Sequence, residues 1–258
     1  MTGTLEDVKR QVAIANRVLS AMGLATAHRL SLGHASMRLP GKPDQFVVKG
    51  RGYKLDALPA MLPENMILCD IEGNMLDGPP GSTQCFEVKI HSCIYKTRPE
   101  VNAVVHVHPT FVVLMSVLGR AIRPMAQEGV QLVAKPLPVY PHMRTVQSDE
   151  EGMDHAKYLG KHKAVLLQGH GATTTGADLE EAVMNMLHLE EQAKMNYYAM
   201  SAVGPDYPCI PDALIAELDN RTPLAALPHF REPIERAKGP PRVGGVWQYY
   251  TRQVSADM

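Results

Sequence analysis

The chain has 258 residues, 45% of them hydrophobic, which is enough for one large buried core and predicts a single domain over residues 1–258. Its formal net charge is -1 and its acidic and basic residues are interspersed, which argues against a nucleic-acid or anionic-membrane partner and favours a small-molecule ligand. There is no C-x-x-C pair among the four cysteines, no signal peptide and no apolar stretch long enough to span a membrane, so we expect a reduced cytoplasmic protein.

An amphipathic helix and short strands are expected in the first part of the chain. Apolar residues recur at helical spacing from residue 5 to residue 22, and Gly23 then ends the helix. Strand-like segments follow, which we interpret as meandering antiparallel strands, at residues 35–39, 45–48 and 66–70. A second helix is predicted over residues 85–96, with Glu87 and His91 on one of its faces.

The middle of the chain alternates strands with helices, which predicts an α/β or α+β layered domain. Apolar runs predict strands at residues 101–108, 137–140 and 164–167. Helical periodicity predicts helices over residues 111–118, 148–161 and 178–202. The pairs Ser148 with Glu151 and Asp178 with Glu181 are typical of helix N-termini, because the first side chain of each pair accepts a hydrogen bond from a free backbone N–H.

The last part of the chain is rich in proline and lacks periodicity. From about residue 204 to residue 245 we therefore expect an irregular arm that lies on the body or on a neighbouring subunit. Residues 247–250, Trp-Gln-Tyr-Tyr, are interpreted as a closing strand.

Three histidines stand where strand-like runs end. His106 and His108 are two residues apart, so on a strand both point to one face, and His170 follows the apolar run at residues 164–167 and stands between two glycines. A single such histidine is more often structural. Three of them near one edge of a sheet predict a catalytic metal site, with three imidazole ligands and an open position for substrate.

The sequence around these histidines resembles the class II aldolase/adducin-like family, to which fuculose-phosphate aldolase belongs. The resemblance rests on Glu87-x-x-x-His91, on residues 98–108 (Arg-Pro-Glu-Val-Asn-Ala-Val-Val-His-Val-His) and on Gly169-His170-Gly171, and it extends from the first helix to about residue 200. It implies an α/β fold, an αβα three-layer sandwich with a mostly antiparallel central sheet. It also implies a homotetramer with one divalent metal ion per subunit, bound near the subunit interfaces.

The same resemblance implies roles for individual residues. Glu87 corresponds to the catalytic acid/base, and the metal ligands are His106, His108 and His170. A carboxylate beside a cation can either bind the metal or move protons, and a dry, cation-rich cleft can tune its pKa. His91 is interpreted as structural. The metal itself stays open, because Zn, Mn, Fe and Co all accept such ligands.

Three segments depart from the sugar-phosphate aldolases of this family. The positions that hold phosphate in those enzymes are occupied here by Gly33-His34, by residues 49–52 (Lys-Gly-Arg-Gly) and by Cys85-Phe86. Imidazole, ammonium and guanidinium groups suit a planar carboxylate, although Lys and Arg also bind phosphate. The aldolase tyrosine that protonates the leaving aldehyde would fall near residues 127–129, and no tyrosine is there.

A second pattern instead resembles the family's metal-dependent decarboxylases of hydroxylated aromatic acids. It consists of Gly-His-Ala-Ser-x-Arg at residues 33–38 and Lys-x-Arg-Gly at residues 49–52. The substrate-binding residues that it implies are His34, Ser36, Lys49 and Arg51. The alternative for the basic residues His34, Lys49 and Arg51 is an ordinary turn or surface position.

We therefore expect a metal-dependent lyase of aromatic compound catabolism. Its substrate would be a hydroxylated aromatic or heteroaromatic carboxylate, decarboxylated through a metal-stabilised enolate or dienolate. An aldolase, epimerase or dehydratase acting on a hydroxy-ketone or sugar phosphate is the main alternative, since it uses the same electron sink. A metal-dependent oxygenase and a non-catalytic adducin-like interaction module are further alternatives, and the retained ligand set argues against the module.

Overall fold

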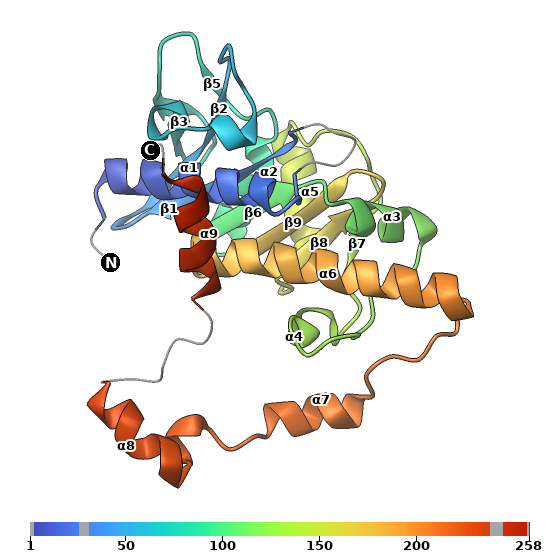
Figure 1. Cartoon of the computed structure of the whole chain (residues 1–258). Helices are drawn as coiled ribbons and strands as arrows, with labels where there is room; N and C mark the ends of the chain where they lie inside the picture. The colour runs from blue at the N-terminus through green and yellow to red at the C-terminus, as the bar shows by residue number, and fades with distance from the viewer. Residues whose placement is uncertain (1–2, 26–30, 238–244, 257) are drawn as a thin grey trace.

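The computed structural model describes residues 3–25, 31–237, 245–256 and 258. Within these residues the chain forms a nine-stranded sheet with helices on both faces (Figure 1). The strand order is β4-β3-β2-β1-β6-β9-β8-β7, with β5 paired to β2, and every pairing is antiparallel except that of β7 with β8. The expected αβα sandwich around a mostly antiparallel sheet is confirmed.

The strands and helices have the following bounds. The strands are β1 (Gly33–Leu39), β2 (Lys42–Arg51), β3 (Met66–Asp70), β4 (Met75–Asp77), β5 (Thr83–Gln84), β6 (Ala103–Val107), β7 (Val139–Tyr140), β8 (Ala164–Leu167) and β9 (Gly171–Gly176). The α-helices are α1 (Leu5–Ala21), α2 (Val88–Thr97), α3 (Thr110–Leu118), α4 (Val130–Val133), α5 (Asp149–Leu159), α6 (Leu179–Val203), α7 (Asp212–Asp219), α8 (Pro228–Arg236) and α9 (Val246–Val254). In the described part of the chain, no helix combines the length and the apolar character needed to cross a membrane.

The sheet separates two hydrophobic cores, because successive side chains of a strand point to opposite faces. On β6, Val105 and Val107 pack into the core shared with α1 and α6, whereas Val104 packs with residues of α2 and α5. His106 has the same parity as Val104. The alternation therefore directs this histidine into the layer between the sheet and α2.

The predicted helix starts are confirmed where capping residues defined them. Ser148 and Glu151 form a reciprocal capping box at α5, and the Asp178 side chain accepts a hydrogen bond from the Glu181 backbone N–H at α6. Both helices begin one residue after the capping residue, as the pattern requires.

Two elements near the site differ from the prediction. The helix expected over residues 85–96 begins only at Val88, so Glu87 occupies the N-cap position and not a helical face. Strand β9 was not expected, because its Thr-Thr-Thr core lacks apolar alternation. All six residues of β9 are nevertheless buried, since the strand lies between β6 and β8.

The carboxyl-terminal region is also more helical than predicted. The expected irregular arm contains α7 and α8, while its residues 238–244 lie outside the described part. The closing strand predicted for residues 247–250 is wrong, because these residues belong to α9. Their apolar spacing explains the helix: side chains three and four residues apart pack on the core beside α1, namely Trp247, Tyr250 and Val254.

Candidate active site

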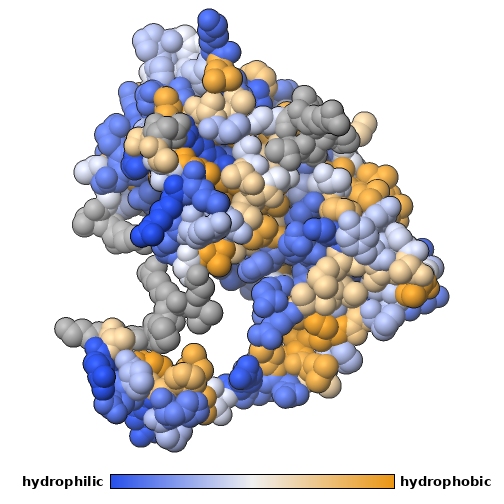
Figure 2. Space-filling view, viewed as in Figure 1, coloured by the Kyte–Doolittle hydropathy of each residue, from blue (hydrophilic) through white to orange (hydrophobic). Residues whose placement is uncertain are grey.

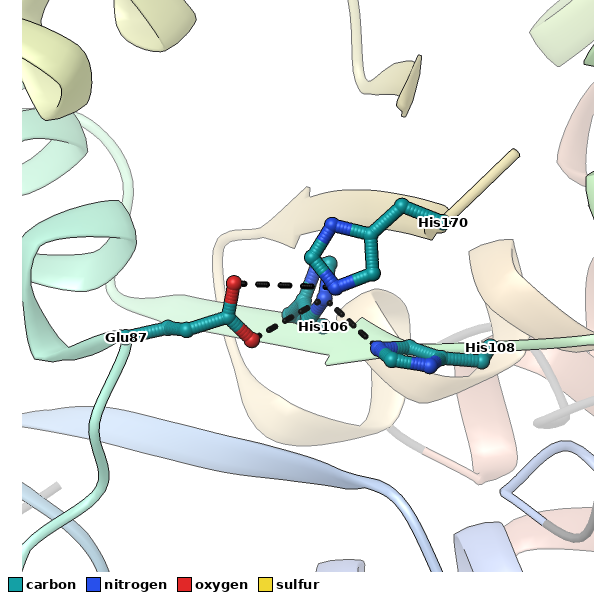
Figure 3. Close-up of side chains that lie close together, drawn as sticks. All are labelled: Glu87, His106, His108 and His170. Carbon is teal, nitrogen blue, oxygen red and sulfur yellow. Dashed lines mark hydrogen bonds and ion pairs between the residues drawn. The ribbon is translucent and has the colours of Figure 1, made fainter. Parts of the chain in front are cut away.

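Four side chains from separate parts of the chain converge where the central strand β6 ends (Figure 3). His106 comes from β6, His108 follows that strand, His170 lies in the turn between β8 and β9, and Glu87 precedes α2. One donor atom from each of the four lies within 4.8 Å of the other three. The structure thus brings together all three predicted metal ligands and the predicted acid/base.

The distances between these donor atoms fit one divalent ion. The Nε2 atoms of His106 and His108 are 3.2 Å apart. The two Glu87 carboxylate oxygens lie 3.6 Å from His106 Nε2 and 3.7 Å from His170 Nε2. Ligands bound at about 2.0–2.1 Å in a tetrahedron are separated by roughly 3.3–3.4 Å. The donor set therefore suits a cation between the four side chains.

Glycine residues allow the two strands that carry the histidines to approach closely. Gly169 adopts a positive φ of 67°, which turns the chain after β8. A Cβ atom at Gly171 would lie 2.5 Å from the Val107 carbonyl oxygen and 2.8 Å from the His108 ring. Only glycine fits there, and this contact holds His170 beside His108.

Hydrogen bonds behind His106 orient its ring. The register between β6 and β9 sets His106 opposite Thr173, and the Thr173 hydroxyl lies 3.1 Å from His106 Nδ1 and 3.2 Å from His155 Nε2. If His106 Nδ1–H donates to Thr173, then Nε2 keeps its lone pair for a metal. Sequence reasoning missed Thr173 and His155, because the pairing of β9 with β6 brings Thr173 to the site and His155 reaches Thr173 from helix α5.

Glu87 is buried but held in its charged form. Burial by itself raises the pKa of the carboxyl group, yet the hydrogen bond from His34, electrostatic interactions with His34 and His170 and the backbone N–H of Val146 outweigh burial and bring the pKa below its usual range. Val146 N–H donates to Oε1 at 3.2 Å, and His34 Nε2 lies 3.5 Å from Oε2. Both oxygens are thereby oriented toward the histidine cluster.

The predicted substrate-binding residues lie at different depths. Arg51 places its guanidinium 4.7 Å from the centre of the exposed Phe86 ring, next to Glu87 in the chain. Lys49 is buried, paired with Asp56, and donates to the Gly50 carbonyl oxygen at 2.9 Å.

His34 and Ser36 lie on the inner side of the same region. His34 adjoins Glu87, and burial lowers the pKa of its ring more than the hydrogen bond to Glu87 and the charge of that carboxylate raise it. Ser36 is fully buried behind His34, where it contacts His91 and not the metal-ligand cluster. Any contribution of Ser36 to the site therefore passes through another side chain.

Comparison with known proteins identifies the family. The sequence model of the Class II Aldolase and Adducin N-terminal domain matches residues 10–197. The chain belongs to this family. The class II aldolase architecture is also present in the solved L-fuculose 1-phosphate aldolase from Glaciozyma antarctica, with a TM-score of 0.73 at 24% identity over 99% of this chain and 92% of that one.

Two curated relatives of this class II aldolase family member are decarboxylases. The chain is 32% identical over 224 residues to 3,4-dihydroxyphthalate decarboxylase from Arthrobacter keyseri, covering 83% of this chain and 87% of the relative. It is 32% identical over 195 residues to 3-oxo-tetronate 4-phosphate decarboxylase from Haemophilus influenzae, covering 73% of this chain and 86% of the relative. The protein is an enzyme of the lyase class, and the predicted family and lyase chemistry are confirmed.

Proposed function

We propose that the protein decarboxylates a hydroxylated aromatic or heteroaromatic carboxylate. The observation that carries this proposal is the convergence of Glu87 with three histidines beside the basic side chains His34 and Arg51. The relative that acts on 3,4-dihydroxyphthalate supports an aromatic substrate with adjacent hydroxyl and carboxylate groups. We infer a role in aromatic compound catabolism from the same likeness.

The ion that the histidines would hold is a single Zn, Mn, Fe or Co per subunit, since all four accept imidazole and carboxylate ligands. The histidines in question are His106, His108 and His170. When bound, such an ion stabilises the negative charge that develops on the substrate oxygen next to the breaking carbon–carbon bond. Glu87 either completes the ligand set or stays free to exchange protons with the substrate.

Arg51 and Phe86 are suited to hold the substrate carboxylate. The Nε atom of Arg51 is buried and lacks a hydrogen-bond partner among the described residues, while the ring of Phe86 supports the guanidinium. A planar guanidinium donates two parallel hydrogen bonds to a carboxylate. The carboxylate that Arg51 holds is therefore retained, and the carboxylate released is the one beside the substrate hydroxyl.

In the proposed reaction Glu87 accepts one proton and then returns it. As a carboxylate it accepts the proton of the substrate hydroxyl, and the electron pair of that O–H bond shifts toward the ring. Glu87 then returns this proton to the ring carbon that bears the departing carboxylate, and the electron pair pushed into the ring forms the new C–H bond. The carbon–carbon bond breaks, carbon dioxide leaves and the bonding pair returns to the oxygen. One proton from solvent converts the resulting phenolate to the hydroxyarene.

A specific relative supports a second candidate. The 32% identity to 3-oxo-tetronate 4-phosphate decarboxylase favours decarboxylation of a 3-oxo acid that bears a phosphate, with Lys49 and Arg51 as phosphate partners. Carbon dioxide release from metal-loaded protein, measured in parallel with hydroxyaryl carboxylates and with 3-oxo sugar-acid phosphates, separates the two. Release from neither class, together with cleavage of a hydroxy-ketone, refutes decarboxylation and supports the aldolase alternative.

His108→Ala is the matched negative control for that assay. Loss of one imidazole should remove bound metal and turnover while the fold is retained, because His108 lies outside β6 and half-exposed at the site. Full turnover in this variant contradicts the proposed metal centre.

We also propose a homotetramer with sites near the subunit interfaces. Support comes from exposed apolar side chains beside the site, since Val117 and Met143 lie against the Gly169 turn. The arm lies below the sheet in Figure 1, where Gln131 of α4 donates a hydrogen bond to Asp219 of α7, and it carries exposed apolar side chains as well (Figure 2), including Leu214 and Phe230. Mass measurement in solution tests the tetramer.

A further inference from the structure

A continuous chain of hydrogen bonds runs from Glu87 into the core. His34 Nδ1 lies 2.7 Å from His91 Nε2, and His91 Nδ1 lies 2.6 Å from the Ser36 hydroxyl. The Ser36 hydroxyl in turn lies 2.7 Å from the Tyr95 hydroxyl. The four side chains behind Glu87 are all buried: His34 and Ser36 come from β1, and His91 and Tyr95 come from α2.

The short distance between His34 and His91 distinguishes a direct hydrogen bond from a second metal site. Cys85 lies near both rings, so the three side chains offer a set of potential metal ligands. The two nitrogens are 2.7 Å apart, which is a direct hydrogen bond and too short for two ligands of one ion. Burial also raises the pKa of the Cys85 thiol, which disfavours a metal-binding thiolate.

The hydrogen-bond chain can run in only two directions, because a neutral imidazole carries one N–H. His34 and His91 are 3% and 0% exposed, and burial disfavours a second proton on either ring because the charged imidazole would lose its solvation. If His34 Nδ1–H donated to His91, the bare Nε2 of His34 would face the Glu87 carboxylate, and two acceptors would meet. In the opposite direction every contact pairs a donor with an acceptor.

We propose that Tyr95, Ser36 and His91 hold His34 in the tautomer that carries its proton on Nε2. The Tyr95 hydroxyl donates to Ser36, Ser36 donates to His91 Nδ1, and His91 Nε2–H donates to His34 Nδ1. His34 Nε2–H then points at Glu87 Oε2, 3.5 Å away. His34 thereby orients the carboxylate that handles the proton, and His91 and Ser36 are positioning residues.

The inner end of the chain excludes a proton wire to solvent. Tyr95 is 2% exposed, and its ring packs 5.1 Å from the centre of the Phe46 ring. The Arg38 guanidinium covers the Tyr95 ring at 4.6 Å. A hydrogen-bond chain that ends in the core offers no route for proton exchange with water. Its effect on Glu87 is therefore to orient the carboxylate. The catalytic part of this inference rests on the proposed role of Glu87.

The tautomer can be measured without substrate. Zn²⁺-loaded protein labelled with ¹⁵N-histidine gives two-bond ¹H–¹⁵N correlations that distinguish a protonated from an unprotonated ring nitrogen, and His34→Gln assigns the His34 signals. We expect protonated Nε2 and unprotonated Nδ1 in the wild-type protein. A protonated Nδ1 overturns the proposal, whatever the activity assays give.

Variants then test the hydrogen-bond chain. Ser36→Ala should mix the two His34 tautomers and lower kcat about tenfold with KM little changed, and Ser36→Thr should restore both. Ser92→Ala is the matched control, because Ser92 is a fully buried serine beside His91 that takes no part in the chain. Unchanged tautomer and kcat in Ser36→Ala refute the proposal. A protein with the expected tautomer that releases no carbon dioxide refutes only the proposed function.

Discussion

Replacing Thr173 with valine tests how the protein prepares His106 for a metal. Valine has nearly the shape of threonine, so Thr173→Val removes a hydroxyl from the fully buried β9 without opening a cavity. The hydroxyl contacts His106 Nδ1 at 3.1 Å and His155 Nε2 at 3.2 Å. The substitution therefore removes the hydroxyl that contacts His106 Nδ1, while the other contacts of this ring with His34 and His108 remain.

The expected effects follow from these two contacts. Partners that support a metal-binding histidine contribute about 10- to 100-fold in metal affinity, which corresponds to about 1.4–2.8 kcal/mol. Each ring nitrogen left buried without a partner costs about 1–3 kcal/mol in the free energy of unfolding. Competition with a chelator for Zn²⁺ measures the first effect, and urea unfolding of the metal-free protein measures the second.

Thr175→Val supplies the control for this experiment. Thr175 lies two residues along β9 on the same face and is also buried, but its hydroxyl reaches only the Lys163 carbonyl oxygen, at 3.5 Å. We expect wild-type Zn²⁺ affinity in Thr175→Val. Equal Zn²⁺ affinities for Thr173→Val and the wild-type protein would refute the role assigned to Thr173.

The remaining predictions concern Glu87, His155 and Arg51. Glu87→Gln should lower kcat about 10²- to 10⁴-fold. Metal analysis of the same preparation distinguishes proton transfer from metal ligation. Metal retained at the wild-type level supports the acid/base role of Glu87, and loss of metal supports the ligand role. Burial lowers the pKa of His155 from 6.5 to about 4, so the unfolded chain takes up its proton first as the pH falls. Above pH 6.5 this histidine should leave the free energy of unfolding of the metal-free protein unchanged, and as the pH falls toward 4 that free energy should drop by up to roughly 3 kcal/mol because of this group. Urea unfolding at several pH values measures the drop. No loss over this range contradicts a neutral buried His155 ring. Arg51→Leu should raise KM about tenfold or more for a substrate with two carboxylates and much less for one with a single carboxylate, and equal changes in steady-state kinetics would show that Arg51 holds no carboxylate.

Local patterns in the sequence predicted the parts of the site that depend on neighbours in the chain. The spacing of His106 and His108 and the glycines around His170 indicated the histidine cluster, because strand alternation and tight turns are properties of short segments. The capping pair Ser148–Glu151 predicted the start of α5 for the same reason. The resemblance to the family indicated Glu87 as the acid/base. The sequence did not predict that Glu87 lies before α2, because the helix was expected to begin at residue 85.

Contacts between distant segments were decided only by the tertiary structure. Thr173 supports His106 because β9 pairs with β6 in one register, and a shift of one residue would turn its hydroxyl to the other face. Ser36 meets His91 because α2 packs across β1. By itself the sequence determined which residues can bind a metal and where the main strands and helices lie. The packing of the sheet decided which side chains support those residues, because hydrogen-bond partners are chosen by distance in space.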